Sequence, residues 1–122
     1  MAWSMNVNNV FLQISSSNAA RLHAFYSEVI GLPPAPMGFR ALQAGGLTIG
    51  FDEHSEIAGP TKEPARVLIN LSVDDIVAEE ERLEAAGVLF VRKQGRELWG
   101  GVFSTFTDPD GNYVQLVQYK PE

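Results

Sequence analysis

The chain has 122 residues, which is enough for one domain with a single hydrophobic core but not for two independent ones. Its net charge of −6 argues against nucleic acid or an anionic membrane as a partner, and it has no cysteine for disulfides, thiol catalysis or thiolate metal sites. No basic segment followed by an apolar stretch opens the chain, and no run approaches the ~20 apolar residues of a membrane span. We therefore expect a cytoplasmic protein.

The first half of the chain predicts a strand, a helix and a hairpin. Residues 10–15 alternate as a strand does, and residues 15–18 offer oxygen side chains that can cap a helix. Apolar residues then recur at i, i+3, i+4 and i+7 from Leu22, and Gly31 ends this helix. After a proline-rich connection, residues 38–43 and 47–51 predict two strands of a hairpin.

The second half repeats this order. Residues 67–73 predict a strand, Asp74 and Asp75 a cap, residues 76–86 a helix, and Gly87 its end. Strands are predicted over 88–92, 101–107 and 113–118, with a strong turn signal at 108–112. The chain therefore predicts a β-α-β-β-β unit given twice within one domain, residues 1–122. Module one covers about 8–52, a polar linker about 53–65 and module two about 66–119.

Three motifs in the chain are typical of one superfamily. Residues 21–32 (RLHAFYSEVIGL) are similar to its helix motif R-x-x-x-F-Y-x-x-V-L-G-L, and residues 106–116 (FTDPDGNYVQL) to its ending F-x-D-P-D-G-N-x-x-E-L. Residues 73–88 are similar to its second helix. The chain thus resembles the vicinal oxygen chelate superfamily, which includes glyoxalase I, extradiol dioxygenases and bleomycin-resistance binding proteins.

This resemblance implies an α+β fold in which two β-α-β-β-β modules form an open, curved mixed sheet. The sheet is shaped as a cup, with the helices outside and the ligand inside. The resemblance also implies a homodimer, because members of this size commonly complete their pockets with a partner subunit. It leaves the chemistry open, since the fold hosts lyases, dioxygenases and non-catalytic binders.

The positions that hold the metal in metal-dependent members can be carried over residue by residue. They fall on Phe11, Gly50, Leu68 and Gln115. The first three have no side-chain donor atom, whereas a divalent first-row ion needs three or four N or O ligands. We therefore predict no metal, no cofactor and no catalytic residue. We interpret His23, on the flank of the first helix, and His54, in the linker, as ordinary surface histidines.

The faces expected to line the cup combine apolar surface with neutral hydrogen-bonding groups, which suits an organic ligand with a few polar atoms. The side-chain amides of Gln13, Asn70 and Gln115 are expected to share this space, and they need hydrogen-bond partners because an unpaired buried amide costs about 1–3 kcal/mol. A ligand, water or one another would serve as partners. Trp99 could stack on a planar ligand or pack at a dimer interface. Arg40 could pair with an acidic ligand or face solvent. The predicted ligand-binding residues are Phe11, Gln13, Arg40, Thr48, Gly50, Leu68, Asn70, Trp99, Tyr113 and Gln115.

The sequence favours a metal-independent protein that binds a small, largely apolar organic molecule. Its most concrete form is sequestration of an antibiotic or natural product, with a second copy of the chain as the only macromolecular partner. The alternative is a metal-dependent lyase or dioxygenase of the glyoxalase type whose ligands are displaced. A third hypothesis is a small partner or regulatory domain whose cup holds no ligand. It predicts bulky side chains filling the space, where the chain has Ser15, Thr48, Gly50 and Ser72.

Overall fold

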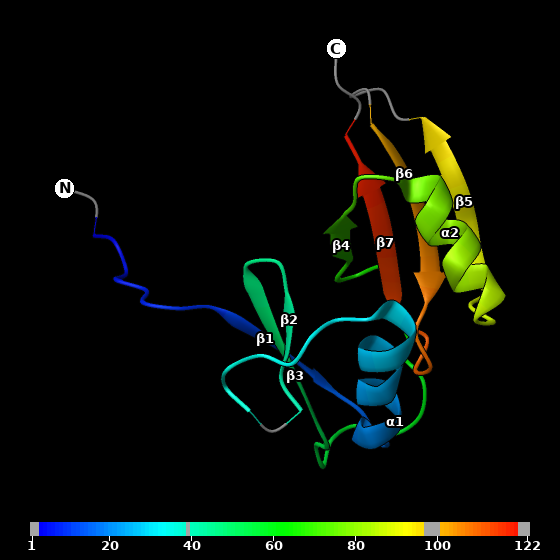
Figure 1. Ribbon diagram of the computed structural model, residues 1–122. Coiled ribbons are helices and arrows are strands. Elements are labelled where there is room, and N and C mark those ends of the chain that lie inside the picture. The colour runs from blue at the N-terminus through cyan, green and yellow to red at the C-terminus, as the bar shows by residue number, and fades with distance from the viewer. Residues whose placement is uncertain (1–2, 39, 97–100, 120–122) are drawn as a thin grey trace.

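The computed structural model describes residues 3–38, 40–96 and 101–119 (Figure 1). The first module contains β1 (Phe11–Ser15), a helix formed by α1 (Ala19–Ala24) and η1 (Phe25–Ile30), β2 (Leu42–Ala44) and β3 (Leu47–Asp52). The second contains β4 (Ile69–Ser72), α2 (Ile76–Ala85), β5 (Phe90–Arg96), β6 (Val102–Thr107) and β7 (Tyr113–Gln118). The α+β class that the family resemblance implies is confirmed.

Each module has its own open mixed sheet. The strand orders are β1-β3-β2 and β4-β7-β6-β5. In both modules the first strand pairs in parallel with the last, so the two sheets share one topology. Within the described part of the chain no hydrogen-bonded ladder joins β1 to β4. The expected cup therefore consists of two separate sheets, and β1 and β4 are each an edge strand of their own sheet.

The helices begin and end where local chemistry predicts. Asn18 and Asp75 each accept a hydrogen bond from the backbone N–H three residues further on, at 3.1 Å. These bonds satisfy donors that the first turn of a helix leaves free. Gly31 and Gly87 follow the helices with φ of 94° and 89°, a left-handed conformation that glycine adopts without steric cost. The first helix widens into a π-helix from Phe25.

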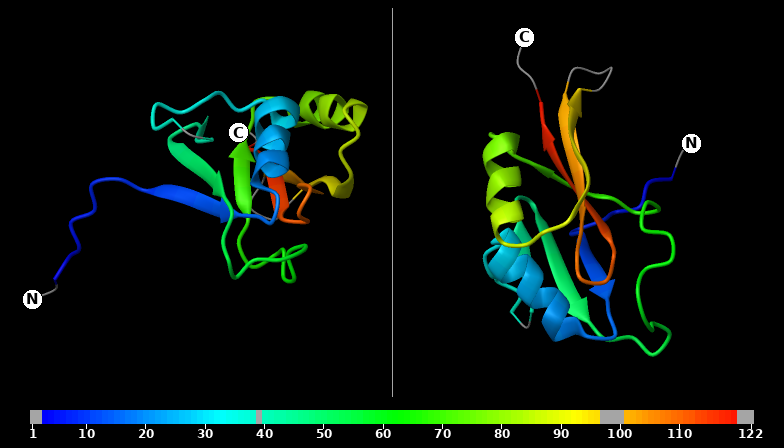
Figure 2. Two further views of the ribbon diagram at one scale, coloured as in Figure 1. Left: turned by 90° about the horizontal axis from the view of Figure 1, so that it is seen from below. Right: turned by 90° about the vertical axis from the view of Figure 1, so that its right-hand side faces the viewer.

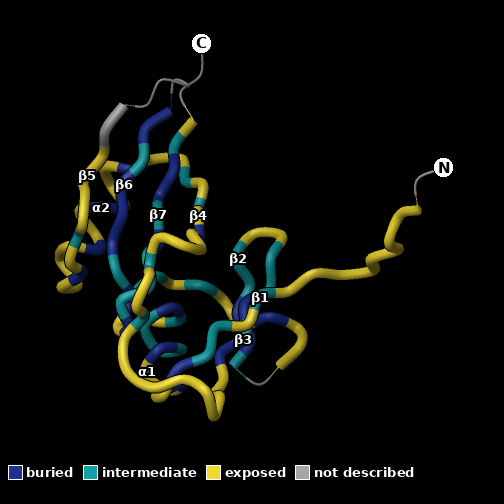
Figure 3. The backbone as a smooth tube through the Cα atoms, turned by 180° about the vertical axis from the view of Figure 1, so that it is seen from behind, coloured by how far each residue is buried: buried dark blue, intermediate teal, exposed yellow. Residues whose placement is uncertain are grey.

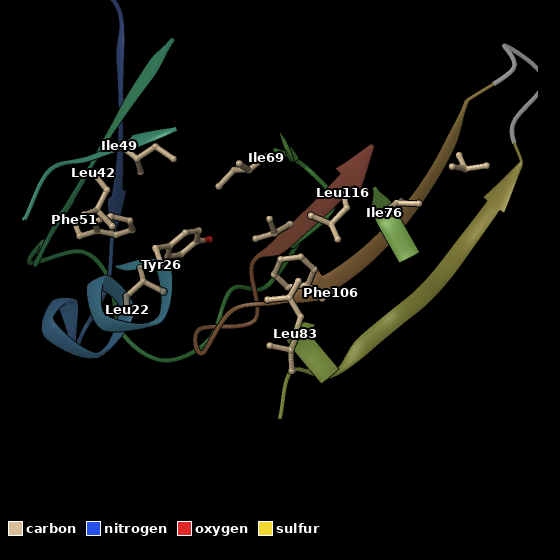
Figure 4. Packing of buried hydrophobic residues seen from close by; sticks show 13 residues of the cluster. Leu22, Tyr26, Leu42, Ile49, Phe51, Ile69, Ile76, Leu83, Phe106 and Leu116 are labelled. Carbon is tan, nitrogen blue, oxygen red and sulfur yellow. The ribbon is translucent and has the colours of Figure 1, made fainter. Parts of the chain in front are cut away.

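The strand register separates a core face from an open face. Leu12 lies opposite Ile49 and Ile69 opposite Val114, and all four belong to or pack against the core. Their neighbours in sequence, such as Gln13, point to the other face. The alternation that the sequence predicts for residues 10–15 agrees with this register. Thirteen buried residues from both modules form one cluster (Figure 4), so the two sheets share a single core.

The first module differs from the prediction around Arg40. The sequence predicts a strand over 38–43, whereas β2 begins only at Leu42 and Arg40 has a positive φ of 57°. The Ala41 N–H donates to the Gly38 carbonyl at 3.0 Å, and this turn prevents an extended chain. The β-α-β-β-β order requires one further strand between the first helix and β2. In this module that strand is reduced to one bridge between Pro34 and Leu42, because proline has no N–H to donate.

Two segments lie outside the packed layers. Residues 3–10 are extended and exposed, and they lead away from both sheets (Figures 1 and 3). The linker between β3 and β4 runs down the side of the molecule that lies away from both helices (Figure 2, right). No helix in the described ranges is long and apolar enough to cross a membrane.

Candidate functional site

A cavity lined by described residues lies in the gap between the two modules. It has a volume of about 550 Å³ and is partly open to solvent. One wall is β1, the opposite wall is the start of β4 and the turn before β7, and the linker forms the third. Its lining consists of residues 12–15, residues 56–62, Val67, Ile69, Asp110, Asn112 and Tyr113.

Thr61 attaches the linker to the turn before β7. Its backbone N–H donates to the Asp110 carbonyl at 2.8 Å, and its hydroxyl bonds to the side-chain oxygen of Asn112. Further back, the Ile57 N–H donates to the His54 carbonyl at 3.0 Å and closes a local turn. The linker is therefore a structured wall of the cavity, although most of its side chains are exposed.

The turn over residues 108–112 is itself held by a buried carboxylate. Asp108 is 5% exposed and accepts hydrogen bonds from the backbone N–H groups of Asp110 and Asn112 at 2.9 and 3.0 Å. The hydroxyl of Tyr26, from the first module, donates to its other oxygen at 2.7 Å. Burial raises the pKa of the Asp108 carboxyl, although the bonds from Tyr26 and Asn112 oppose the rise. Burial and the neighbouring Asp108 raise the pKa of Tyr26, so its hydroxyl remains a donor.

A second link neutralises the charge at this turn. Arg21, on α1, bonds to a carboxylate oxygen of Asp110 at 2.8 Å, and the Asp110 side chain is only 7% exposed. The pair spans the modules and leaves that oxygen engaged. Asp110 therefore contributes little free negative charge to the cavity it lines.

Most of the polar side chains that line the cavity have free hydrogen-bonding groups. Gln13, Ser15 and Tyr113 make no side-chain hydrogen bond to any residue that the structure describes. Around them stand apolar groups from β1, the linker and β4, including Ile14, Ile57 and Ile69. An apolar enclosure with a few unpartnered polar groups is the usual composition of a small-molecule site.

The ten predicted ligand-binding residues do not all reach this cavity. Gln13 and Tyr113 line it, whereas Asn70 lines a second cavity of about 420 Å³ between η1, the β2–β3 turn and α2. Gln115 is turned to β6, where its amide donates to the Thr105 hydroxyl at 3.0 Å. The three amides that were expected in one space are therefore distributed over three environments.

The other predicted residues that the structure describes lie on the open faces or in turns. Phe11 and Leu68 are 53% and 40% exposed. Thr48 donates its hydroxyl to Gln43 at 2.9 Å, and the guanidinium of Arg40 lies 3.9 Å from Glu53. Gly50 pairs with Gln13 across β1 and β3, and Trp99 lies outside the described residues. None of the predicted ligand-binding residues lies in the linker, although residues 56–62 form a wall of the cavity. The only local signal for this wall is Thr61, a hydrogen-bonding residue within a polar stretch that contains proline.

The residues at the metal positions do not fit a metal ion. Gln115 has the only donor atoms among the four, and its amide nitrogen is directed at Thr105. In the described part of the chain no three His, Asp or Glu side chains gather closely enough to hold an ion. His23 packs edge-on against the Phe51 ring, with centroids 5.9 Å apart, and the exposed His54 accepts from the Glu56 N–H at 3.1 Å.

Solved structures share this fold across nearly the whole chain. TnmS3, an antibiotic binding protein from Streptomyces sp. CB03234, is 24% identical with a TM-score of 0.69, over 96% of this chain and 100% of that one. A glyoxalase/bleomycin resistance protein/dioxygenase family enzyme from Burkholderia phytofirmans PsJN is 20% identical with a TM-score of 0.73, over 90% and 97%. Lactoylglutathione lyase from Agrobacterium tumefaciens is 17% identical with a TM-score of 0.69, over 94% and 96%.

These likenesses show the fold and not the activity, because a binding protein and a lyase match with the same TM-score of 0.69. No protein of curated function matches the chain significantly. The model of one sequence family does match, over residues 10–116. That stretch contains the linker, the whole cavity lining and both modules up to the middle of β7. The chain therefore belongs to the glyoxalase/bleomycin resistance protein/dioxygenase superfamily.

Proposed function

We propose that this protein binds a small, largely apolar organic molecule in the cavity between β1, the linker and β4, without a metal ion and without transforming it. The observation that carries the proposal is the cavity itself, in which apolar walls surround the unpartnered side chains of Gln13, Ser15 and Tyr113. Residues without donor atoms at three of the four metal positions support the metal-free form.

Sequestration of an antibiotic or natural product is the concrete version of this function. It requires tight binding and slow release but no catalytic group. The antibiotic binding protein TnmS3, which has the same fold, supports this version. In this chain, apolar contact with Ile57 and Tyr113 would supply affinity, and Gln13 would orient the ligand through its amide.

We also propose that two copies of the chain associate. Phe11 and Leu68, on the open sides of the two modules, are 53% and 40% exposed, and Trp3 and Met5 on the extended arm are 80% and 73% exposed. Apolar surface of this extent favours a protein contact. Native mass spectrometry and light scattering test this point: a monomer at micromolar concentration would contradict it.

The binding proposal is tested with N-phenyl-1-naphthylamine, a neutral apolar fluorophore, titrated into the purified protein. We expect saturable binding of one probe per cavity, unchanged by chelator or by added Zn²⁺, Ni²⁺, Mn²⁺ or Fe²⁺. Ile57→Ala removes part of the apolar wall, and we expect about a fivefold loss of affinity. Val77→Ala is the matched control, because Val77 is exposed to a similar extent, 45% against 41%, but lies on α2.

Elemental analysis and native mass spectrometry of the untagged protein complete the test. A co-purifying organic mass would support the proposal and begin to identify the ligand. Stoichiometric transition metal, or probe binding that depends on it, would overturn the metal-free form and favour the lyase or dioxygenase alternative. Equal effects of the Ile57 and Val77 variants would show that the probe does not occupy this cavity.

A further inference from the structure

We propose that the cavity selects apolar molecules that also carry an acidic group, and that the Lys62 ammonium binds this group. The inference rests on the proposed binding function and names the chemical class of its ligand. It begins with the position of Lys62, at the end of the linker wall and on the lining of the cavity.

Lys62 differs from every other Lys or Arg side chain that the structure describes, because it has no partner. The others contact a carboxylate or an aromatic ring: Arg21, Arg40, Arg66, Arg82, Arg92 and Lys93. The lack of a partner is not due to a shortage of carboxylates, since the chain has 15 acidic residues and 9 basic ones. Even the adjacent Glu63 pairs with Arg66, at 2.8 Å. The Lys62 side chain is therefore available to a ligand at the cavity.

The other polar groups that line the cavity with Lys62 favour an anionic partner. The one buried acid of the lining, Asp110, is already paired with Arg21 at 2.8 Å. Gln13, Ser15 and Tyr113 each have a side-chain hydrogen that can be donated, and none of these three donates it within the described part of the protein. A carboxylate, sulfonate or phenolate would accept from such groups and from the ammonium together.

The Glu56 carboxylate would repel the acidic group of a ligand and so sets the orientation of that ligand in the cavity. It lines the same cavity, it has no cation partner among the described residues, and it stands at the opposite end of the wall segment 56–62. The acidic group of a ligand would therefore lie toward Lys62, and the apolar body would extend toward Ile57. Removing Glu56 should strengthen the binding of an anion, whereas removing Lys62 should weaken it.

Two matched probes separate this charge effect from binding itself. 1-Anilinonaphthalene-8-sulfonate and N-phenyl-1-naphthylamine have the same anilinonaphthalene body, and only the first carries a sulfonate. In Lys62→Gln we expect the sulfonate probe to bind about two- to fivefold more weakly, the range of exposed ion pairs, and the neutral probe to bind as before. Lys93→Gln makes the same charge change away from the cavity lining and should alter neither affinity.

Three further results decide the proposal. Glu56→Gln should tighten the sulfonate probe and leave the neutral probe unchanged. Added salt should weaken the sulfonate probe in the native protein and much less in Lys62→Gln. If Lys62→Gln and Lys93→Gln act alike, or if Lys62→Gln weakens both probes equally, the role of Lys62 is refuted while the cavity stands. Failure of both probes to bind the native protein would instead overturn the binding function.

Discussion

Tyr26→Phe removes a single oxygen from the interior and tests the link between the two modules. Tyr26 is fully buried, and its hydroxyl donates to Asp108 at 2.7 Å, from a helix of the first module to the last turn of the second. The phenylalanine ring would keep the contacts with Phe25 and Phe51. The variant therefore isolates the hydrogen bond from the packing.

The expected cost follows from the charge and burial of the acceptor. A hydrogen bond to a charged group contributes about 1.5–3 kcal/mol. Asp108 would keep the bonds from the Asn112 side chain and from two backbone N–H groups, which places the loss in the lower half of that range. We expect unfolding to become easier by about 1.5–2 kcal/mol at neutral pH, which lowers Tm by about 6–8 °C for a chain of this size.

The cost should also depend on pH, with a definite sign. Burial raises the pKa of Asp108 in the folded state above its value in the unfolded chain. Protonation of Asp108 therefore stabilises the fold fully below the unfolded pKa, and this contribution is lost as pH rises through the folded pKa. The Tyr26 bond lowers this folded pKa, so Tyr26→Phe raises it further. The variant should therefore be penalised most at pH values where Asp108 is ionised, and less as acid protonates it.

Urea denaturation from neutral to acid pH measures both effects. Tyr26→Phe in an Asp108→Asn background is the control, because a neutral acceptor should reduce the cost to about 0.5–1.5 kcal/mol. The reasoning is refuted if Tyr26→Phe costs less than about 0.5 kcal/mol at neutral pH. A cost that stays constant into the acid range would refute the assignment of the pH dependence to Asp108.

Three further substitutions have expected outcomes of different kinds. Ser104→Ala should leave stability unchanged or raise it by up to about 1 kcal/mol in urea denaturation, because its buried hydroxyl has no partner within the described structure; a clear loss would reveal a missed partner. Gly87→Ala should lower the free energy of unfolding by about 1–2 kcal/mol, because Gly87 has a φ of 89°. Gly46 has neither a left-handed φ nor a close neighbour, so Gly46→Ala should be nearly neutral. Equal losses in the two variants would argue against backbone strain. Thr61→Val should speed amide hydrogen exchange in residues 56–62 relative to β6, and unchanged protection would show that the Asn112 bond does not hold the linker.

The parts of the fold that the sequence predicts correctly depend on local chemistry. Gly31 and Gly87 end their helices because a left-handed residue is needed directly after the last turn, and Asp75 caps because its carboxylate reaches a nearby N–H. The phase of β1 follows from alternation alone, so Gln13 is correctly assigned to the face opposite Leu12. Such features need no knowledge of distant residues.

What the sequence does not predict depends on contacts between distant segments. The sequence predicts only a polar linker over about 53–65, yet Thr61 attaches it to Asn112, 51 residues further along the chain. Gln115 was assigned to the ligand, but Thr105 on the neighbouring strand takes its amide. For Arg40, the alternation of residues 38–43 favours a strand, and the turn closed by Gly38 and Ala41 overrides it.

Because the third wall of the cavity is a connecting segment, the size of the binding space is independent of the strand ladders. Residues between Ile57 and Thr61 make no backbone hydrogen bond to either sheet within the described structure, so a residue added or removed there leaves every strand pairing intact. Doubling the length of a loop costs only about 0.6 kcal/mol in closure entropy. A library of linker lengths and compositions between fixed ends at His54 and Thr61 would therefore vary ligand range on a constant scaffold, with the 108–112 turn as its anchor.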